Sequence, residues 1–187
     1  MVSNPTQHDC PFILSIQNWL EQIVIGLNLC PFAKREFIKS RIHYEVCHSD
    51  KVPDLLESLQ QALTQLANNP KIETTLIIHP NILQHFEDYN EFLDLAEQLL
   101  FALGHEGTIQ IASFHPDYQF ANTQQNDPEN YTNRSPFPLI HLLREDSVEK
   151  AISTYPNPEQ IPANNIALMN KLGSAKLQQL IKGCLAG

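Results

Sequence analysis

Basic residues are scarce in this sequence: 12 Lys and Arg stand against 21 Asp and Glu, giving a formal net charge of -9. The basic residues are scattered and form no run that resembles a basic tail. Proteins that bind nucleic acids need clustered basic groups, because neutralised phosphates release the counterions that drive binding. The charge balance therefore predicts that no nucleic acid is a partner of this protein.

The sequence also lacks a long hydrophobic run. Its longest nearly uncharged apolar stretch, Ile23–Phe32, is much shorter than the roughly 20 residues that a membrane-spanning helix needs. The polar stretch Met1–Cys10 contains no basic region followed by an apolar one, which argues against a signal peptide. We therefore expect a soluble, cytoplasmic protein with no membrane partner.

The cysteines contain no CxxC pair. They are widely spaced, at Cys10, Cys30, Cys47 and Cys184, which does not suggest a zinc ribbon or a redox pair. In the cytoplasm we expect all of these thiols to stay reduced.

Short motifs that identify common enzyme classes are absent. The sequence has no GxGxxG, GxxxxGK[ST], HExxH or GxSxG, which disfavours dinucleotide-binding, kinase and hydrolase functions and predicts no nucleotide cofactor. A metal ion is still a candidate cofactor, because the fold could bring together four residues of the types that bind metals: Cys30, His115, Asp117 and His141.

The pattern of apolar residues predicts the fold class. A chain of 187 residues with 42% apolar residues can form one domain over residues 1–187, of which 1–9 are expected to be a loose tail. Strand and helix patterns alternate, which favours an α/β fold with a single mixed sheet of about four strands covered by helices. The expected strands lie near residues 42–47, 74–78, 108–114 and 139–144.

Helical spacing of apolar residues appears between and around these strands. The first helix begins near Phe12 and ends near Gly26–Asn28, where Gly and Asn tolerate left-handed backbone conformations. An apolar turn over Leu29–Ala33 follows it. Further helices are expected over residues 55–66, 86–103, 148–155 and 160–183, the last with a break near Gly173.

The segment 115–138 between the last two strands has no regular pattern. A connection of that length in a compact domain is usually functional, and binding residues concentrate on loops. The pairs His79-Pro80 and His115-Pro116 each follow a strand, and parallel strands present ligand sites at their carboxyl ends. We therefore predict that segment 115–138 is a functional loop.

Three residues could carry catalysis. His115 could act as a general acid or base, with Asp117 orienting it or binding a metal; alternatively, Asp117 caps a turn in which His115 is half exposed. Cys30 could be a nucleophile or a metal ligand, in which case iodoacetamide would label it before Cys10, or it could be a buried thiol that acts as a small hydrophobe.

Five residues could bind substrate: Asn133, Arg134, Ser135, His141 and Arg144. The planar guanidinium of an arginine suits a carboxylate or phosphate, although either arginine could instead pair with a local acid and pin the loop. His141 lies in an otherwise apolar strand, where a histidine is either a core residue or a ligand contact.

Four motifs occur together: GLNLCPFA (26–33), SFHPDYQFA (113–121), YTNRSP (131–136) and HLLRE (141–145). As a set they resemble a bacterial family of domains of unknown function that has relatives in plants. The resemblance extends from about Trp19 to Gly173. It implies a stand-alone, soluble, single-domain protein and carries no catalytic assignment.

These observations lead to two main hypotheses for function. The first is an enzyme that acts on a small anionic metabolite through a His/Asp/Arg site, with Cys30 or a metal taking part. The alternative is a non-catalytic module that binds a small molecule or a protein, and a purely structural loop on an interaction module is a third. The enzyme needs His115 within reach of Cys30 or a metal, whereas the binding protein needs only a lined pocket. The sequence does not predict the oligomeric state.

Overall fold

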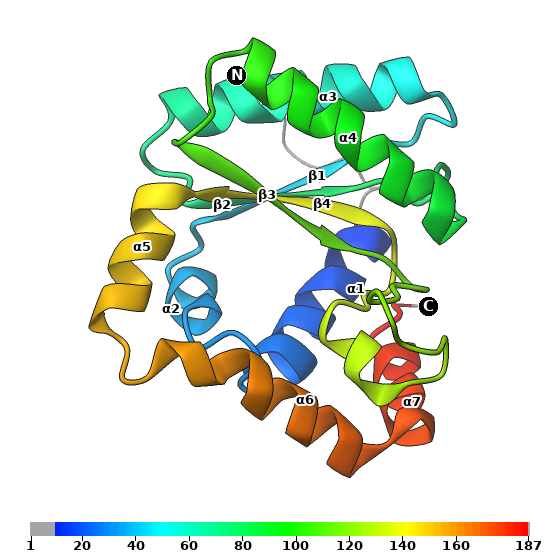
Figure 1. The fold of residues 1–187 in the computed structure, drawn as a ribbon. Coiled ribbons are helices and arrows are strands. Elements are labelled where there is room, and N and C mark those ends of the chain that lie inside the picture. Colours follow the sequence, from blue (N-terminus) through cyan, green and yellow to red (C-terminus); the bar gives the residue numbers. More distant parts are fainter. Residues whose placement is uncertain (1–9, 187) are drawn as a thin grey trace.

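The computed structural model describes residues 10–186, so the expected tail at residues 1–9 lies outside the described residues. Its centre is one four-stranded sheet in the order β1-β2-β4-β3 (Figure 1). β1 and β2 are parallel, and β4 is antiparallel to both β2 and β3. This confirms the predicted α/β class and the single mixed sheet. The strands are β1 (Ile42–Val46), β2 (Thr74–Ile78), β3 (Ile109–Phe114) and β4 (Leu139–Arg144).

The register brings three strand ends to one edge of the sheet. Val46 pairs with Ile78, Ile78 pairs with Leu139, and Leu139 pairs with Phe114. The carboxyl ends of β1, β2 and β3 therefore meet there beside the start of β4. Each His-Pro pair follows one of these ends, as the sequence predicted.

Two long helices cover one face of the sheet, α3 (Val52–Asn68) and α4 (Phe86–Ala102) (Figure 1). Both are amphipathic, and each buries its apolar stripe against the strands. The core on this side includes Leu59, Leu63, Ile77, Phe92 and Ile140. The two helical patterns predicted between the strands are thereby confirmed.

The opposite face is covered by α1 (Cys10–Trp19) and by the C-terminal helices α6 (Ile161–Leu172) and α7 (Ser174–Gly183) (Figure 1). Residues that alternate with those of the first core point to this side, and the second core includes Ile16, Trp19, Leu76, Ile78 and Leu139. The predicted break near Gly173 separates α6 from α7.

The remaining α-helices are α2 (Ala33–Ile38) and α5 (Glu145–Thr154), and a short 3-10 helix, η3 (Pro158–Gln160), precedes α6. α2 was not predicted. It follows directly on the turn expected over Leu29–Ala33, and its six residues are too few to show a helical spacing of apolar residues. No helix within residues 10–186 is both long and apolar enough to cross a membrane.

The first helix departs from the expected regular geometry. After Trp19 it continues as a π-helix, η1 (Leu20–Ile25), a form that is rare and frequent at functional sites. Gly26 follows, and a Cβ there would overlap the carbonyl oxygen of Gln22. Asn28 then takes a left-handed conformation, with φ of 56°, which confirms the predicted end of the helix.

Candidate functional site

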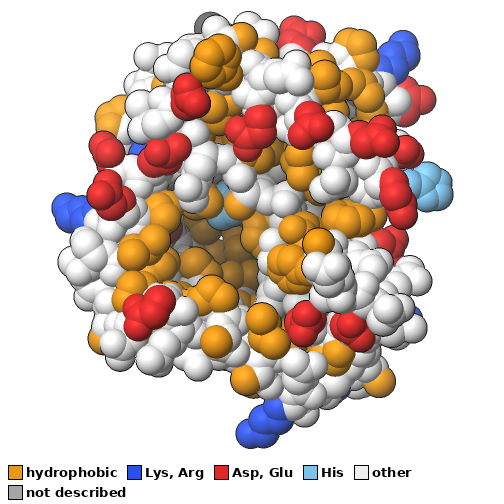
Figure 2. Space-filling view, in the orientation of Figure 1, with side chains coloured by type: hydrophobic (Ala, Val, Ile, Leu, Met, Phe, Trp, Pro, Cys, Tyr) orange, Lys and Arg blue, Asp and Glu red, His pale blue; other side chains and the backbone are white. Residues whose placement is uncertain are grey.

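A pocket of about 390 Å³ lies between the sheet and α6. It opens on the face of the molecule where Figure 2 shows a hollow lined largely by hydrophobic side chains. Its walls come from four parts of the chain: the end of η1 with the following turn, the end of β3, the loop after β3 with the short 3-10 helix η2 (Pro128–Thr132), and the first turns of α6.

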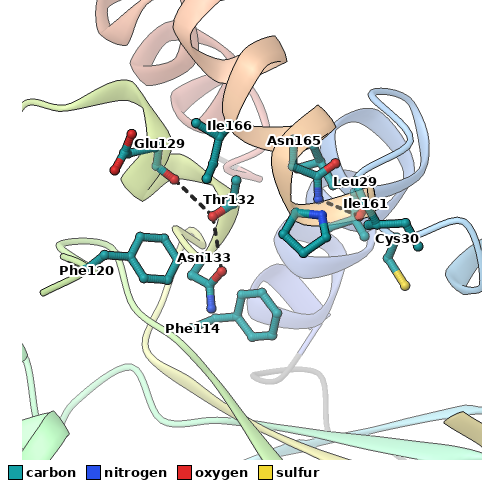
Figure 3. Close-up of a pocket in the computed structure, with 12 residues that line it drawn as sticks. Leu29, Cys30, Phe114, Phe120, Glu129, Thr132, Asn133, Ile161, Asn165 and Ile166 are labelled. Atoms are coloured by element: carbon teal, nitrogen blue, oxygen red, sulfur yellow. Dashed lines mark hydrogen bonds between the residues drawn. The ribbon is translucent and has the colours of Figure 1, made fainter. Parts of the chain in front are cut away.

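Most of the pocket wall is apolar. Figure 3 shows the rings of Phe114 and Phe120 on one side and Ile161 and Ile166 of α6 on the other (Figure 3). Val24 of η1 and Leu29 of the turn add further apolar surface. A pocket of this size and lining suits a small molecule, since such sites are concave, mostly apolar and contain few polar groups.

The turn that carries Cys30 is held by the π-helix and by α6. The carbonyl oxygen of Val24 accepts hydrogen bonds from the backbone N–H groups of Leu29 (2.9 Å) and Cys30 (3.4 Å). From the other side, Asn165 donates its side-chain N–H to the carbonyl oxygen of Leu29 at 2.8 Å (Figure 3). The unusual helix geometry therefore positions one wall of the pocket.

Asn133 is held at the opposite wall. Its Nδ2 donates to the carbonyl oxygen of Ser113 at 3.2 Å, and its Oδ1 accepts from the hydroxyl of Thr132 at 3.2 Å. The same hydroxyl contacts the carbonyl oxygen of Glu129 at 2.9 Å. The carboxamide is thus fixed by the end of β3 and by η2, and both Asn133 and Thr132 line the pocket.

Cys30 is partly buried at the pocket wall. Burial raises the pKa of its thiol, and hydrogen bonds from the backbone of Phe32 and Ala33 offset this only in part. The thiol is therefore protonated at neutral pH, whereas nucleophilic cysteines require a lowered pKa. The structure places Cys30 neither deep in a core nor in a thiolate-stabilising environment.

His115 is fully buried, at 0% exposure, and not half exposed as the alternative prediction had it. Its Nδ1 accepts the backbone N–H of Asp117 at 3.0 Å, so its Nε2 carries the proton and donates to the carbonyl oxygen of Leu83 at 3.0 Å. Burial lowers the pKa of His115. Neither ring nitrogen is free for a ligand, and Asp117 contacts the ring through its backbone. The pair ties the long loop to the chain after β2.

Arg134 is buried within the long loop. Its guanidinium donates to the carbonyl oxygens of Tyr118 (3.1 Å) and Gln125 (2.6 Å) and lies 4.5 Å from the ring centroid of Tyr131. The backbone of Arg134 in turn accepts the indole N–H of Trp19 at 3.0 Å. One prediction was that Arg134 holds the long loop in place by pairing with an acid. Arg134 does hold the loop, but it donates to carbonyl oxygens and not to an acid.

Arg144 lies at the far end of β4, away from the pocket edge. Its guanidinium donates to the carbonyl oxygens of Leu66, Asn69 and Ile72 and so closes the end of α3. Ser135 is also buried, and its hydroxyl donates to the carbonyl oxygen of Phe137 at 2.6 Å. Both side chains therefore donate their hydrogen bonds to backbone carbonyl oxygens within the protein.

His141 lies on the sheet face that borders the pocket. Its ring centroid is 6.0 Å from that of the pocket-lining Phe114, and its Nε2 is 2.7 Å from the hydroxyl of Thr74. Of the predicted site residues, the structure therefore brings together Cys30 and Asn133 at the pocket, with His141 beside it. The others lie elsewhere: His115, Asp117, Arg134, Ser135 and Arg144.

Sequence reasoning missed the contribution of α6. Asn165 lies four residues after Ile161 and four before Met169, so it shares their apolar face. A carboxamide in such a stripe is the signal that could have identified it. Sequence reasoning also missed Thr132 as a pocket residue.

No three His, Cys, Asp or Glu side chains within residues 10–186 are grouped so that they could hold a metal ion. The set considered from the sequence, Cys30, His115, Asp117 and His141, is thus not assembled among the described residues. In comparisons with known proteins, a family model described as "Protein of unknown function (DUF1415)" matches residues 12–179. Neither a search of curated proteins nor a search of solved structures gave a match.

Proposed function

The chain belongs to the DUF1415 family of proteins of unknown function, and we propose that it binds a small, largely apolar molecule in the pocket between the sheet and α6. One observation carries this proposal. The pocket joins the turn at Cys30, the strand end at Phe114, the loop at Asn133 and the helix at Asn165. Hydrogen bonds hold its polar side chains in place, which is typical of a preformed ligand site.

The composition of the wall supports an uncharged ligand in place of the anionic metabolite expected from the sequence. None of the pocket-lining residues is Lys or Arg, and Glu129 is among them. The two arginines considered as anion anchors, Arg134 and Arg144, donate to backbone carbonyl oxygens. An anion would therefore lose its hydration in the pocket without gaining a paired positive charge.

The same contacts favour binding over catalysis. A catalytic cysteine needs a base or a positive charge that stabilises its thiolate. Burial raises the pKa of Cys30, and both ring nitrogens of His115 are hydrogen-bonded to the backbone. The proposal therefore takes up the second function expected from the sequence, a non-catalytic small-molecule-binding module.

The test uses N-phenyl-1-naphthylamine, an uncharged probe whose fluorescence rises in an apolar environment. Ile166 lines the pocket and is 41% exposed, so Ile166→Trp should fill the pocket without disturbing a core. Ile152 of α5 is 42% exposed and does not line the pocket, so Ile152→Trp is the matched control.

We expect saturable binding of the probe to the wild type and to Ile152→Trp, and at least a tenfold weaker affinity for Ile166→Trp. Thermal unfolding should show that both variants are folded. If the wild type does not bind the probe, or if Ile166→Trp binds it as well as Ile152→Trp does, the proposal is wrong.

A further inference from the structure

β3 is an edge strand, because the sheet order β1-β2-β4-β3 leaves one of its sides without a neighbouring strand (Figure 1). Just before this strand, the carbonyl oxygen of Thr108 accepts the N–H of Glu145 at 3.0 Å, so the backbone groups of Thr108 point toward the chain of β4. The backbone groups of successive residues in an antiparallel strand point to opposite edges. The outer edge of β3 therefore carries the N–H and C=O groups of Ile109, Ile111 and Ser113.

Part of this outer edge is satisfied within the protein. The N–H of Ile109 donates to the carbonyl oxygen of His105 at 3.0 Å, and the carbonyl oxygen of Ser113 accepts from Asn133 Nδ2 at 3.2 Å. The other outward groups have no hydrogen-bond partner within residues 10–186: the carbonyl oxygens of Ile109 and Ile111, and the N–H groups of Ile111 and Ser113. An added antiparallel strand would use all of them, because one of its residues exchanges both bonds with Ile111 while its next outward residues reach Ile109 and Ser113.

The two edge strands of the sheet differ in how they discourage such pairing. β1 carries Glu45, a partly buried carboxylate that accepts the hydroxyl of Ser58 of α3 at 2.7 Å, and inward-pointing charges of this kind protect edge strands. β3 has no charged residue and no proline, and no bulge interrupts its register with β4. Gln110 is exposed and Ile111 is partly exposed. The outer edge of β3 is therefore open to an added strand.

The charge around β3 indicates which kind of strand fits. Residues 72–133 contain ten Asp and Glu and no Lys or Arg, so this segment alone accounts for the net charge of -9. Figure 2 shows acidic side chains along α4 on the face that contains the hollow (Figure 2). α4 contacts β3 and exposes five carboxylates: Glu87, Asp88, Glu91, Asp94 and Glu97. A second copy of the chain would bring like charges together, whereas Lys and Arg side chains would be attracted.

We infer that the outer edge of β3 binds an extended segment of another protein that is rich in Lys and Arg, which adds to the sheet as an antiparallel strand. Main-chain hydrogen bonds provide the affinity of this mode of recognition, and the carboxylates of α4 select a basic segment. Ile109, Ile111 and Ser113 do not line the pocket. The inference therefore goes beyond the proposed function and does not rest on it.

The test uses calorimetry with a blocked peptide of alternating Lys and Val, and a blocked peptide of alternating Glu and Val is the charge control. Ile111→Pro removes the outward N–H and leaves the hydrogen bonds to β4 in place, whereas Ile111→Ala also loses the side chain but keeps the N–H. We expect the wild type and Ile111→Ala to bind the basic peptide with similar affinity. Ile111→Pro should bind it at least tenfold more weakly, and so should the wild type bind the acidic peptide. Thermal unfolding and binding of N-phenyl-1-naphthylamine should show that both variants are folded.

Amide hydrogen exchange of the wild type provides a readout that does not depend on the variants folding. We expect the amides of Gln110 and Ala112 to exchange slowly with or without peptide, because they face β4. The amides of Ile111 and Ser113 should slow at least tenfold when the basic peptide is added.

The inference is wrong if the wild type does not bind the basic peptide, if it binds the acidic peptide equally well, or if Ile111→Pro binds as Ile111→Ala does. Exchange at Ile111 and Ser113 that the basic peptide leaves unchanged would also overturn it. Protection of these two amides that rises with protein concentration, without peptide, would instead indicate a second copy at this edge and overturn the choice of a basic partner. Binding of N-phenyl-1-naphthylamine tests the pocket separately, so the proposed function stands or falls on its own result.

Discussion

Gly26 lies between the pocket-lining residues Val24 and Leu29, at a point where the backbone leaves no room for a side chain. It follows the π-helix η1, and a Cβ there would overlap the carbonyl oxygen of Gln22, which is backbone and cannot rotate away. The backbone of Gly26 has a φ of -63°, so the barrier to Gly26→Ala is the contact and not the conformation. The substitution should therefore force η1 to relax.

The expected loss of stability follows from two opposing effects. Overpacking of this kind costs about 1–3 kcal/mol, whereas replacing Gly by Ala at a compatible position stabilises by roughly 0.4–1 kcal/mol through the unfolded chain. We therefore expect Gly26→Ala to lower the free energy of unfolding by about 1–2 kcal/mol. The carbonyl oxygen of Val24 would also move from its contacts with Leu29 and Cys30, so binding of N-phenyl-1-naphthylamine should weaken.

Gly183, at the end of α7, is the matched control, because a Cβ there would meet nothing within 4 Å. Urea unfolding should show Gly183→Ala to be as stable as the wild type or up to about 1 kcal/mol more stable, with unchanged probe binding. A Gly26→Ala variant that matches the wild type in both stability and probe affinity would contradict this prediction, because η1 would then tolerate the side chain.

Two further predictions concern titratable groups. Burial raises the pKa of the Cys30 thiol, so iodoacetamide at neutral pH should label the exposed Cys10 first, and mass spectrometry that found Cys30 labelled first would support the enzyme hypothesis instead. Burial lowers the pKa of His79 from 6.5 to about 4, so folding favours its neutral form. The stability that this neutral form contributes is complete above pH 6.5 and is lost as the pH falls toward 4. That loss is about 3 kcal/mol in the free energy of unfolding. Urea unfolding across this pH range should show a smaller loss for His79→Asn than for the wild type. Equal losses in the two proteins would contradict the assignment of this pH dependence to His79.

The strands could be predicted from the sequence because each is a short β-branched or alternating run between breaking residues. β2 and β4 match their predicted ranges, and β1 and β3 differ by one residue at one end. The π-helix could not be predicted, because over six residues its wider turn leaves the spacing of apolar residues unchanged. The overlap that a Cβ at Gly26 would make depends on the backbone geometry, which cannot be read from the residue type.

The candidate site was predicted only in part. Cys30 and Asn133 do line the pocket, but His115 and Arg134 are engaged by carbonyl oxygens of their own and neighbouring loops. Backbone carbonyls are present at every residue, so sequence cannot reveal which side chains they will engage. The contact between Asn165 and Leu29 joins residues 136 positions apart and depends on how α6 packs.

The most direct test of the proposed pocket is to follow its two carboxamides while the probe is added. Asn133 and Asn165 each donate an Nδ2–H from opposite walls, so both give side-chain signals in a nitrogen–proton correlation spectrum. We predict that N-phenyl-1-naphthylamine shifts both pairs of signals with one common dissociation constant, and that Ile166→Trp abolishes the shifts. If the probe binds but the signals of both side chains do not shift, it binds elsewhere, and the proposal of a ligand site at this pocket is contradicted.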